Sequence, residues 1–352
     1  MELPLSAQPR SLCLLRLSAI GDITHVVPVV KTLQQQWPDC KITWIIGKLE
    51  ATLVDDLPGV EFIIFDKSAG IKSLLNIRRQ LRHRQFDILL HMQVALRASL
   101  ISLAVNAPLK LGFDRARAHD YQWLFTNCKI DTIAQQHVMD GFFAFLEKLG
   151  IREKVLQWDI PIPGDAKNSI DRYISADARV LVINPCSSNR LRNWRNWPSE
   201  HYATIADYAI ERHNLQVILS GGTSEIEHNI AQKVCRLSQH KIINLVGKTS
   251  LKQLLALLQR AEALIAPDTG PAHMATAVNT PVIGLFASSN PQRTGPYLSQ
   301  PWIVNRYPDA AEKYLHKPVA ELSWGQRIRN PEVMSLITVE DVTQKLDRLL
   351  SR

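Results

Sequence analysis

The 352-residue sequence is poor in cysteine, and its five cysteines form no C-x-x-C pair. This scatter argues against a zinc ribbon or a disulfide framework and fits a reducing cytoplasm. The beginning of the chain has no basic segment followed by a long apolar core, so we expect no signal peptide. No uncharged apolar run reaches the length of a membrane span. Any contact with a membrane is therefore expected to be peripheral.

Several motifs of nucleotide-binding and hydrolytic enzymes are also missing. The sequence has no G-x-G-x-x-G after its first apolar run, no G-x-S-x-G and no H-E-x-x-H. Gly247-Lys248-Thr249 resembles the end of a P-loop, but Ile242 stands where the first glycine should be, so that interpretation fails. No D-x-D pair offers a divalent metal two neighbouring carboxylates. We therefore expect a mechanism without a metal ion or a bound cofactor.

Composition indicates a globular protein with a basic bias. Apolar residues make up 46% and charged residues 21% of the chain, and its length suits two domains. The 41 Lys and Arg exceed the 33 Asp and Glu, which gives a net charge of +8. Such a bias suggests an anionic partner: a nucleotide, a phosphorylated glycolipid, a membrane surface or nucleic acid. Nucleic acid is the least favoured, because outside one short loop the arginines lack interleaved aromatic residues. A monomer is the default expectation.

Strand and helix patterns alternate along both halves, which predicts an α/β fold of two Rossmann-like domains, each with a mostly parallel sheet. Residues 158–164 carry two prolines and a glycine, so we place the domains at 1–170 and 171–337. A final helix over 339–350, in the segment 338–352, is expected to pack back on the first domain. The expected strands are 11–17, 42–46, 62–65 and 87–90 in the first domain, and 180–184, 216–219, 241–245, 262–266 and 282–286 in the second.

The most informative stretch is 263–275. An apolar run ends at Pro267, and Asp268-Thr269-Gly270 then opens a segment with a helical pattern. In open α/β sheets ligands bind at the carboxyl ends of strands, where the first N–H groups of the next helix can hold a phosphate. Asp268 is either a helix cap or a ligand contact, and Gly270 allows close approach of the backbone. His273 either reaches the same pocket or lies at the surface.

A similar junction follows the first predicted strand. Apolar residues recur at helical spacing from Asp22 onward, so Gly21-Asp22 lies between a strand and a helix. A carboxylate at this place is either an N-cap or a general base that points into a cleft. His25, one turn later, either orients the carboxylate or is solvated.

Two loops of the second domain carry further polar groups. The hydroxyls of Ser187 and Ser188 precede the cations Arg190, Arg192 and Arg195. Hydroxyls and guanidinium groups suit a diphosphate, although a solvated basic loop is the alternative. In the next loop, 220–225, two glycines precede Glu225, which either accepts bonds from a ribose or completes a helix cap.

Two basic clusters interrupt the first domain. One follows a helical stretch, and the other lies in a polar segment after a predicted strand, where recognition of acidic groups is more common. A solvated helix face is the alternative for the first cluster. The clusters are Arg78, Arg79, Arg82, His83 and Arg84, and Lys110, Arg115 and Arg117.

Four segments together resemble the ADP-heptose:lipopolysaccharide heptosyltransferases, inverting glycosyltransferases with two facing Rossmann-like domains, the GT-B architecture. They span nearly the whole chain in the expected order. Two departures stand out: arginine replaces the usual lysine at 195, and His91-Met92-Gln93 stands where many relatives have an aspartate before the glutamine. The segments are Leu17-Ser-Ala-Ile-Gly-Asp22, Arg195-Asn-Trp-Pro198, Ser220-Gly-Gly-Thr-Ser-Glu225 and Pro267-Asp-Thr-Gly-Pro-Ala-His273.

The resemblance implies a role for each matching residue. Asp22 matches the general base, Arg195 a contact to the donor phosphates and Glu225 a contact to the donor ribose. The donor-binding loop is matched by Asp268, Thr269, Gly270 and His273. The implied reaction is an inverting transfer of heptose from ADP-heptose to the Kdo and inner-core region on lipid A, similar to heptosyltransferase I.

The implied setting is the cytoplasm, with peripheral attachment to the inner face of the inner membrane. An acceptor rich in carboxylates and phosphates would give a use to Arg78, Arg79, Arg82, Arg115 and Arg117. Two alternatives stay open: a two-domain binding protein without catalysis, and a nucleotide-sugar epimerase of similar architecture.

Overall fold

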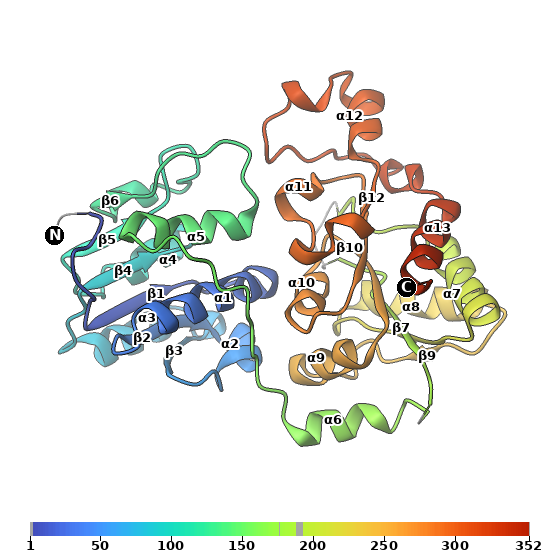
Figure 1. The fold of residues 1–352 in the computed structure, drawn as a ribbon, viewed down its shortest axis with the longest axis horizontal. Helices are drawn as coiled ribbons and strands as arrows, with labels where there is room; N and C mark the ends of the chain where they lie inside the picture. Colours follow the sequence, from blue (N-terminus) through green and yellow to red (C-terminus); the bar gives the residue numbers. More distant parts are fainter. Residues whose placement is uncertain (1–2, 176, 188–192, 352) are drawn as a thin grey trace. The chain divides into compact units, whose positions relative to one another are not determined.

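The computed structural model describes residues 3–175, 177–187 and 193–351. The chain divides into two compact units, Met1–Pro161 and Ile162–Arg352 (Figure 1). Each unit contains a six-stranded sheet in which every neighbouring pair of strands is parallel. Both sheets alternate with helices, as the sequence pattern predicted.

The first unit has the strand order β3-β2-β1-β4-β5-β6. Helices α1 and α5 pack on each other, and α3 packs on α4. The strands are β1 (Ser11–Leu15), β2 (Lys41–Gly47), β3 (Val60–Phe65), β4 (Ile88–His91), β5 (Leu109–Gly112) and β6 (Cys128–Lys129). The helices are α1 (Ile20–Gln36), α2 (Lys48–Val54), α3 (Ile71–Leu81), α4 (Leu96–Ser102) and α5 (Val138–Leu149), with the short 3₁₀ helices η1 (Lys67–Ala69) and η2 (Gln122–Leu124).

The second unit has the order β12-β11-β10-β7-β8-β9. Its strands are β7 (Val180–Ile183), β8 (Gln216–Leu219), β9 (Ile243–Asn244), β10 (Ala263–Pro267), β11 (Val282–Phe286) and β12 (Val304–Asn305). Its helices are α6 (Gly164–Asp171), α7 (Ser199–His213), α8 (Glu225–Leu237), α9 (Leu251–Arg260), α10 (Gly270–Ala277), α11 (Pro291–Thr294), α12 (Tyr307–Leu315) and α13 (Val339–Leu350), with η3 (Tyr297–Trp302), η4 (Val319–Glu321) and η5 (Val333–Leu336).

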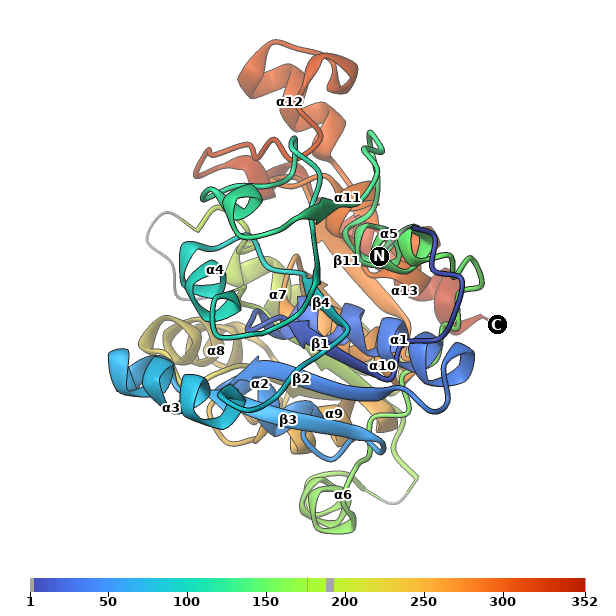
Figure 2. The same ribbon diagram turned by 90° about the vertical axis from the view of Figure 1, so that its left-hand side faces the viewer.

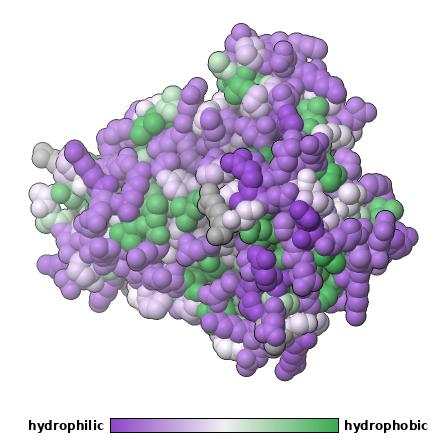
Figure 3. All heavy atoms as spheres, turned by 45° about the vertical axis from the view of Figure 1, so that its right-hand side comes forward, coloured by the Kyte–Doolittle hydropathy of each residue, from purple (hydrophilic) through white to green (hydrophobic). Residues whose placement is uncertain are grey.

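The central strands are mostly apolar because helices cover both faces of each sheet. β4, β7, β10 and β11 are buried along their whole length. The outer surface differs: on the face drawn in Figure 3, hydrophilic side chains cover most of the area and apolar side chains gather in smaller groups. No helix in the described ranges is both long and apolar enough to span a bilayer.

Two boundaries differ from the sequence-based expectation. The chain divides after Pro161 rather than at 170, because α6 belongs to the second unit and packs on α9. Helix α13 was expected to pack on the first domain. Instead its buried residues Val342 and Leu346 join the core of the second unit, where α13 packs on α7.

Candidate functional site

The first unit has its topological switch point at β1, which lies between β2 and β4. The ends of β1 and β4 meet there, since Leu15 is in register with His91. Beyond them, Gln93 Oε1 accepts hydrogen bonds from the backbone N–H groups of Leu17, at 2.6 Å, and Ser18, at 3.2 Å. Gln93 therefore fixes the turn that leads from β1 into α1, at the edge where open α/β sheets bind ligands.

Asp22 lies in the first turn of α1, which begins at Ile20 with Ala19 as its N-cap residue. The carboxylate accepts a hydrogen bond from the Ala19 N–H at 3.3 Å and forms an ion pair with Arg16. Both contacts use Oδ2, and the side chain is 30% exposed. Among the described residues Oδ1 has no such contact. Oδ2 of Asp22 thus helps to cap α1, whereas Oδ1 is left without a contact to these residues.

Arg16 is almost fully buried, and its position is fixed by more than the ion pair. Its Nη1 donates to the carbonyl of Met92 at 2.6 Å, and the guanidinium lies 5.1 Å from the centre of the Phe142 ring. The side chain is only 11% exposed. Arg16 therefore links the loop after β4 to the carboxylate of Asp22.

His91, the last residue of β4, forms hydrogen bonds that hold the same edge of the sheet together. Its Nδ1 accepts from Gln122 Nε2 at 3.2 Å, so its Nε2 carries the proton and faces Ser99 Oγ at 3.3 Å. Gln122 also donates to the carbonyl oxygens of His91 and Gln93. Burial lowers the pKa of His91 to about 3, which keeps the ring neutral. His25 is buried, with its ring centre 5.5 Å from that of His137.

In the second unit the switch point is β7, which lies between β10 and β8. Arg195, from the loop after β7, donates from Nη1 to the carbonyl of Asp268 at 2.9 Å and lies 3.4 Å from its Oδ2. Ser289 donates to the same Oδ2 at 3.0 Å. Asp268 is therefore not the cap of α10, a place that Thr269 holds without a side-chain cap bond. It is a buried carboxylate that ties three loops together.

The remaining residues predicted for the donor have different surroundings. Thr269 and Gly270 are half-buried at the start of α10, and His273 is buried one turn later. Ser187 is buried, and its Oγ bonds to Asn193 and Asn196. Ser188, Arg190 and Arg192 lie outside the described residues.

Glu227, rather than Glu225, takes the helix-cap role that the sequence left open for the loop before α8. Glu227 Oε1 accepts from the Gly222 N–H at 2.7 Å. Its Oε2 accepts from the Ser224 N–H at 3.3 Å, and Ser224 Oγ accepts from the Glu227 N–H at 3.4 Å, which completes a capping box. A side chain at Gly222 would meet that carboxylate at 2.9 Å. Glu225 is exposed and does not contribute to the cap. Its carboxylate is open to a ligand.

Residues 74–325 match the model of glycosyltransferase family 9 (heptosyltransferase). The chain is also 40% identical over 341 residues, 97% of each chain, to the lipopolysaccharide core heptosyltransferase OpsX of Haemophilus influenzae. The chain belongs to glycosyltransferase family 9. It is therefore an enzyme of the heptosyltransferase family.

Solved structures agree on the family 9 fold. A glycosyltransferase family 9 protein of Veillonella parvula matches with a TM-score of 0.80 at 22% identity, over 98% of each chain. The Escherichia coli ADP-heptose LPS heptosyltransferase II matches with a TM-score of 0.74 at 20% identity, over 97% of this chain and 98% of that one. The predicted fold class, two Rossmann-like α/β domains, is confirmed.

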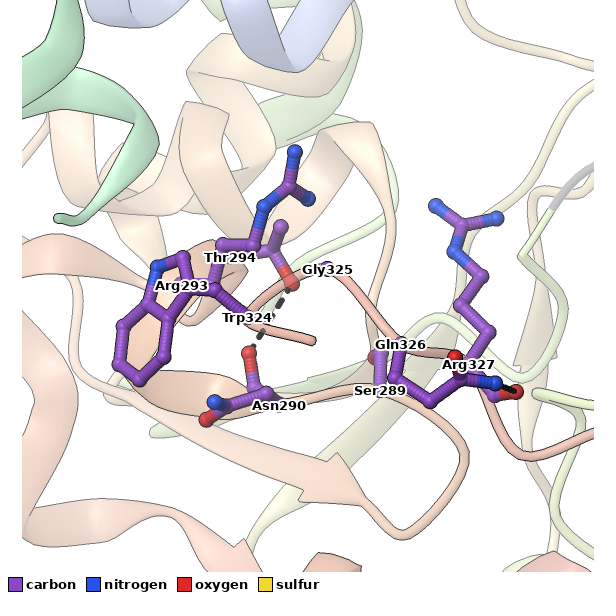
Figure 4. A pocket seen from close by; sticks show the side chains of 8 residues that line it. All are labelled: Ser289, Asn290, Arg293, Thr294, Trp324, Gly325, Gln326 and Arg327. Atoms are coloured by element: carbon purple, nitrogen blue, oxygen red, sulfur yellow. Dashed lines mark hydrogen bonds between the residues drawn. The ribbon is translucent and has the colours of Figure 1, made fainter. Parts of the chain in front are cut away.

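A pocket next to Asp268 was not predicted from the sequence (Figure 4). Thr294, 3.5 Å from Asp268 Oδ2, and Ser289 belong both to its wall and to the surroundings of that carboxylate. The opposite wall is held by Ser288, which accepts from the Ile328 N–H and donates to the Ile328 carbonyl. The sequence does contain a signal for this pocket, the polar run Ser288-Ser289-Asn290 that follows the apolar strand β11. The lining residues are Ser289, Asn290, Arg293, Thr294, Trp324, Gly325, Gln326 and Arg327.

The first basic cluster lies at the amino edge of the sheet, away from Asp22. Helix α3 begins after the end of β3 and ends before β4, so it runs antiparallel to the strands, and its last turn lies at the amino edge of the sheet. Arg78, Arg79 and Arg82 are exposed there, one helix length of about 16 Å from the carboxyl edge. Arg115 stacks 4.0 Å above the Trp123 ring, whereas Arg117 is bound to Asp114 and Gln136.

Proposed function

We propose that this family 9 glycosyltransferase moves a heptose from ADP-heptose to the Kdo and inner-core region of lipopolysaccharide, in a reaction like that of heptosyltransferase I. The 40% identity to a protein named lipopolysaccharide core heptosyltransferase supports the substrate class. A solved relative, the Escherichia coli heptosyltransferase WaaC, is described with ADP and, in a second structure, with ADP-2-deoxy-2-fluoro heptose. The donor in our proposal has the same chemistry.

The observation that supports this mechanism is the set of contacts that Asp22 makes and its exposure. Its Oδ2 is fixed by Arg16 and the Ala19 N–H, while Oδ1 has no such contact with the residues that the structure describes, and the side chain is 30% exposed. In the proposed step, Oδ1 takes the proton of an acceptor hydroxyl. The hydroxyl oxygen attacks the anomeric carbon from the face opposite the nucleotide, and the bond to the diphosphate breaks. The product has the inverted configuration.

The leaving ADP needs positive charge and hydrogen-bond donors. We assign these to Arg195, the hydroxyls of Ser187 and Thr269, and the backbone N–H groups at the start of α10 near Gly270. Glu225, which is exposed, is assigned to the ribose hydroxyls. His273 belongs to the same helix turn. We also assign Arg195 a second role. The guanidinium that we assign to the donor phosphates also donates to the carbonyl of Asp268 and so holds the turn before α10.

We also propose that the enzyme acts at the inner face of the inner membrane, because its acceptor is anchored there by lipid A. Among the described residues, no group of three or more His, Cys, Asp or Glu could hold a metal ion. In the proposed step a proton acceptor and fixed cations supply the catalysis.

The experiment combines the full chain with ADP-heptose and Kdo-lipid A and identifies products by mass spectrometry. We expect the acceptor to gain one heptose and one ADP to appear for each. Parallel acceptors with and without a phosphate on Kdo identify the preferred substrate. Release of ADP at the same rate without any acceptor would contradict a transferase that uses this acceptor. Analysis of the lipooligosaccharide from a strain lacking this gene would independently show where the core is truncated.

A further inference from the structure

The outer face of α3 and α4 is unusually apolar for a helix layer that faces solvent. Five of its large aliphatic side chains are between 44% and 75% exposed. Single exposed leucines are ordinary, but these five lie on two adjacent helices. Figure 2 shows α3 and α4 next to each other, and the two helices contact each other. The side chains are Ile71 and Leu75 from α3, and Leu96, Leu100 and Leu103 from α4 and its C-cap.

Helical spacing shows that these side chains form stripes. In α3, Ser73, Ile77 and Leu81 are buried. Ile71 and Leu75, one turn apart, fall on the other side of the helix. In α4, Ala98 and Ile101 are buried, whereas Leu96, Leu100 and Leu103 follow the i, i+4, i+7 pattern on the outer side. Both helices therefore have two apolar faces, and the sheet covers only one of them.

The charges along these stripes have one sign. Residues 67–86 and 95–112 contain lysine and arginine but no Asp or Glu. Arg84 is used internally in a pair with Glu61. Exposed cations continue the outer side of the two helices, and within the part of the chain that the structure describes they form no ion pair. They are Lys72, Arg78, Arg79, Arg82 and Arg97.

An aromatic segment lies near α4. His91 contacts both Ser99 of α4 and Gln122 of η2, which places these two elements together. In η2 and just before it, Tyr121, Trp123 and Leu124 are 66%, 42% and 63% exposed. Tyrosine and tryptophan are enriched where protein meets the headgroup region of a bilayer.

We infer that the outer face of α3 and α4, together with η2, is a membrane-docking surface that binds anionic phospholipid. Aliphatic side chains enter the boundary between headgroups and acyl chains, and the arginines contact lipid phosphates. Charge complementarity favours lipid over a protein partner, because residues 67–86 and 95–112, which carry α3 and α4, offer cations without any carboxylate. This inference adds a membrane partner to the proposed function. It rests on the proposed function only for the identity of the membrane that is bound. It also gives Arg78, Arg79 and Arg82 a use that their distance from Asp22 allows.

The test is co-sedimentation of the full chain with vesicles of phosphatidylethanolamine and phosphatidylglycerol at 4:1, compared with phosphatidylcholine vesicles. We expect binding to the anionic vesicles that weakens as salt rises. The double variant Leu96→Ser/Leu100→Ser should lower the partition coefficient at least about tenfold, because the loss of exposed aliphatic groups removes buried apolar area. Ile71→Ser/Leu75→Ser on the other helix should do the same. Ile226→Ser/Leu237→Ser, exposed positions of α8, is the matched control and should bind as wild type.

Each other outcome overturns the inference. If the leucine and isoleucine variants both keep the wild-type partition coefficient, another surface binds the vesicles. If the α8 control loses binding as much as they do, the effect of these substitutions is not specific to the face of α3 and α4. A wild-type dimer that dissociates in Leu96→Ser/Leu100→Ser, seen by sedimentation velocity, would mean that a second copy covers the face. Heptose transfer to a soluble, delipidated acceptor should stay unchanged in the leucine variant. That assay reports on the proposed reaction separately, so either claim can fail alone.

Discussion

Arg195 holds the turn that precedes α10 by donating from Nη1 to the carbonyl of Asp268 at 2.9 Å, while the carboxylate Oδ2 lies 3.4 Å from the same nitrogen. The two residues come from loops that follow neighbouring strands, β7 and β10. The loop that we assign to the donor is therefore held by contacts within the protein. Arginine suits this double contact better than lysine, because a planar guanidinium can donate in two directions at once.

Replacing Arg195 should weaken nucleotide binding. The loss of a hydrogen bond to a charged group costs about 1.5–3 kcal/mol, so Arg195→Ala should raise the Kd for ADP about 10- to 100-fold. Arg195→Lys should recover part of that loss. Isothermal titration measures both, and an unchanged Kd in Arg195→Ala would show that the residue does not act in the donor site.

Arg16 should act through Asp22. In Arg16→Gln the carboxylate loses its ion pair, and we expect kcat for transfer to fall about 100-fold because the base is no longer held in place. The Kd for ADP should stay within about threefold, since Arg16 belongs to the first unit. Arg84→Gln, which breaks the exposed pair with Glu61, is the control. Equal kcat values in the two variants would argue against a positioning role.

Glu225 and Glu227 should separate ligand binding from stability. Glu227→Gln weakens the capping box of α8 and should cost about 1 kcal/mol of the free energy of unfolding. Glu225→Gln leaves the cap in place and should raise the Kd for ADP about tenfold through a lost ribose contact. Titration and urea denaturation of both variants check this assignment. A Glu225 variant with wild-type ADP affinity would remove the ribose role.

His91 should make the stability of the first unit depend on pH. Its pKa is lowered by burial from 6.5 to about 3, so unfolding takes up a proton between these values and stability falls as the pH falls through that window. Between pH 6.5 and 5 this contribution reaches about 2 kcal/mol. His91→Gln should lose less stability than wild type over that interval in urea denaturation. The exposed His119→Gln serves as the control, and parallel behaviour of wild type and His91→Gln would contradict the assignment.

Much of the fold followed from sequence pattern. The expected strands 282–286 and 216–219 and the helix 339–350 coincide with β11, β8 and α13, because apolar runs bounded by polar residues mark strands that are covered on both faces. β6 and β12 have only two residues each, too few for a periodic signal, and the expected strand 241–245 is shortened to β9. The placement of α13 failed because periodicity gives the apolar face of a helix but not the surface that covers it.

For a similar reason, the sequence predicted some residues of the site and missed others. Asp22 and Asp268 stand at strand ends, a position that the sequence reveals. Their partners are far away in sequence or of an ordinary type. Arg16 looked like a break in an apolar run, and Gln122 lies in a segment without pattern. The role of Ser289 depends on the strand order, which places β11 beside β10.

The most direct test of the account is single-turnover transfer from ADP-heptose by Asp22→Asn, with ADP binding measured on the same preparation. A general base typically contributes 10²- to 10⁴-fold, so we expect transfer to slow by about 1,000-fold while the Kd for ADP stays within a few-fold of wild type. Transfer by Asp22→Asn within tenfold of the wild-type rate would contradict the claim that this carboxylate takes the acceptor proton.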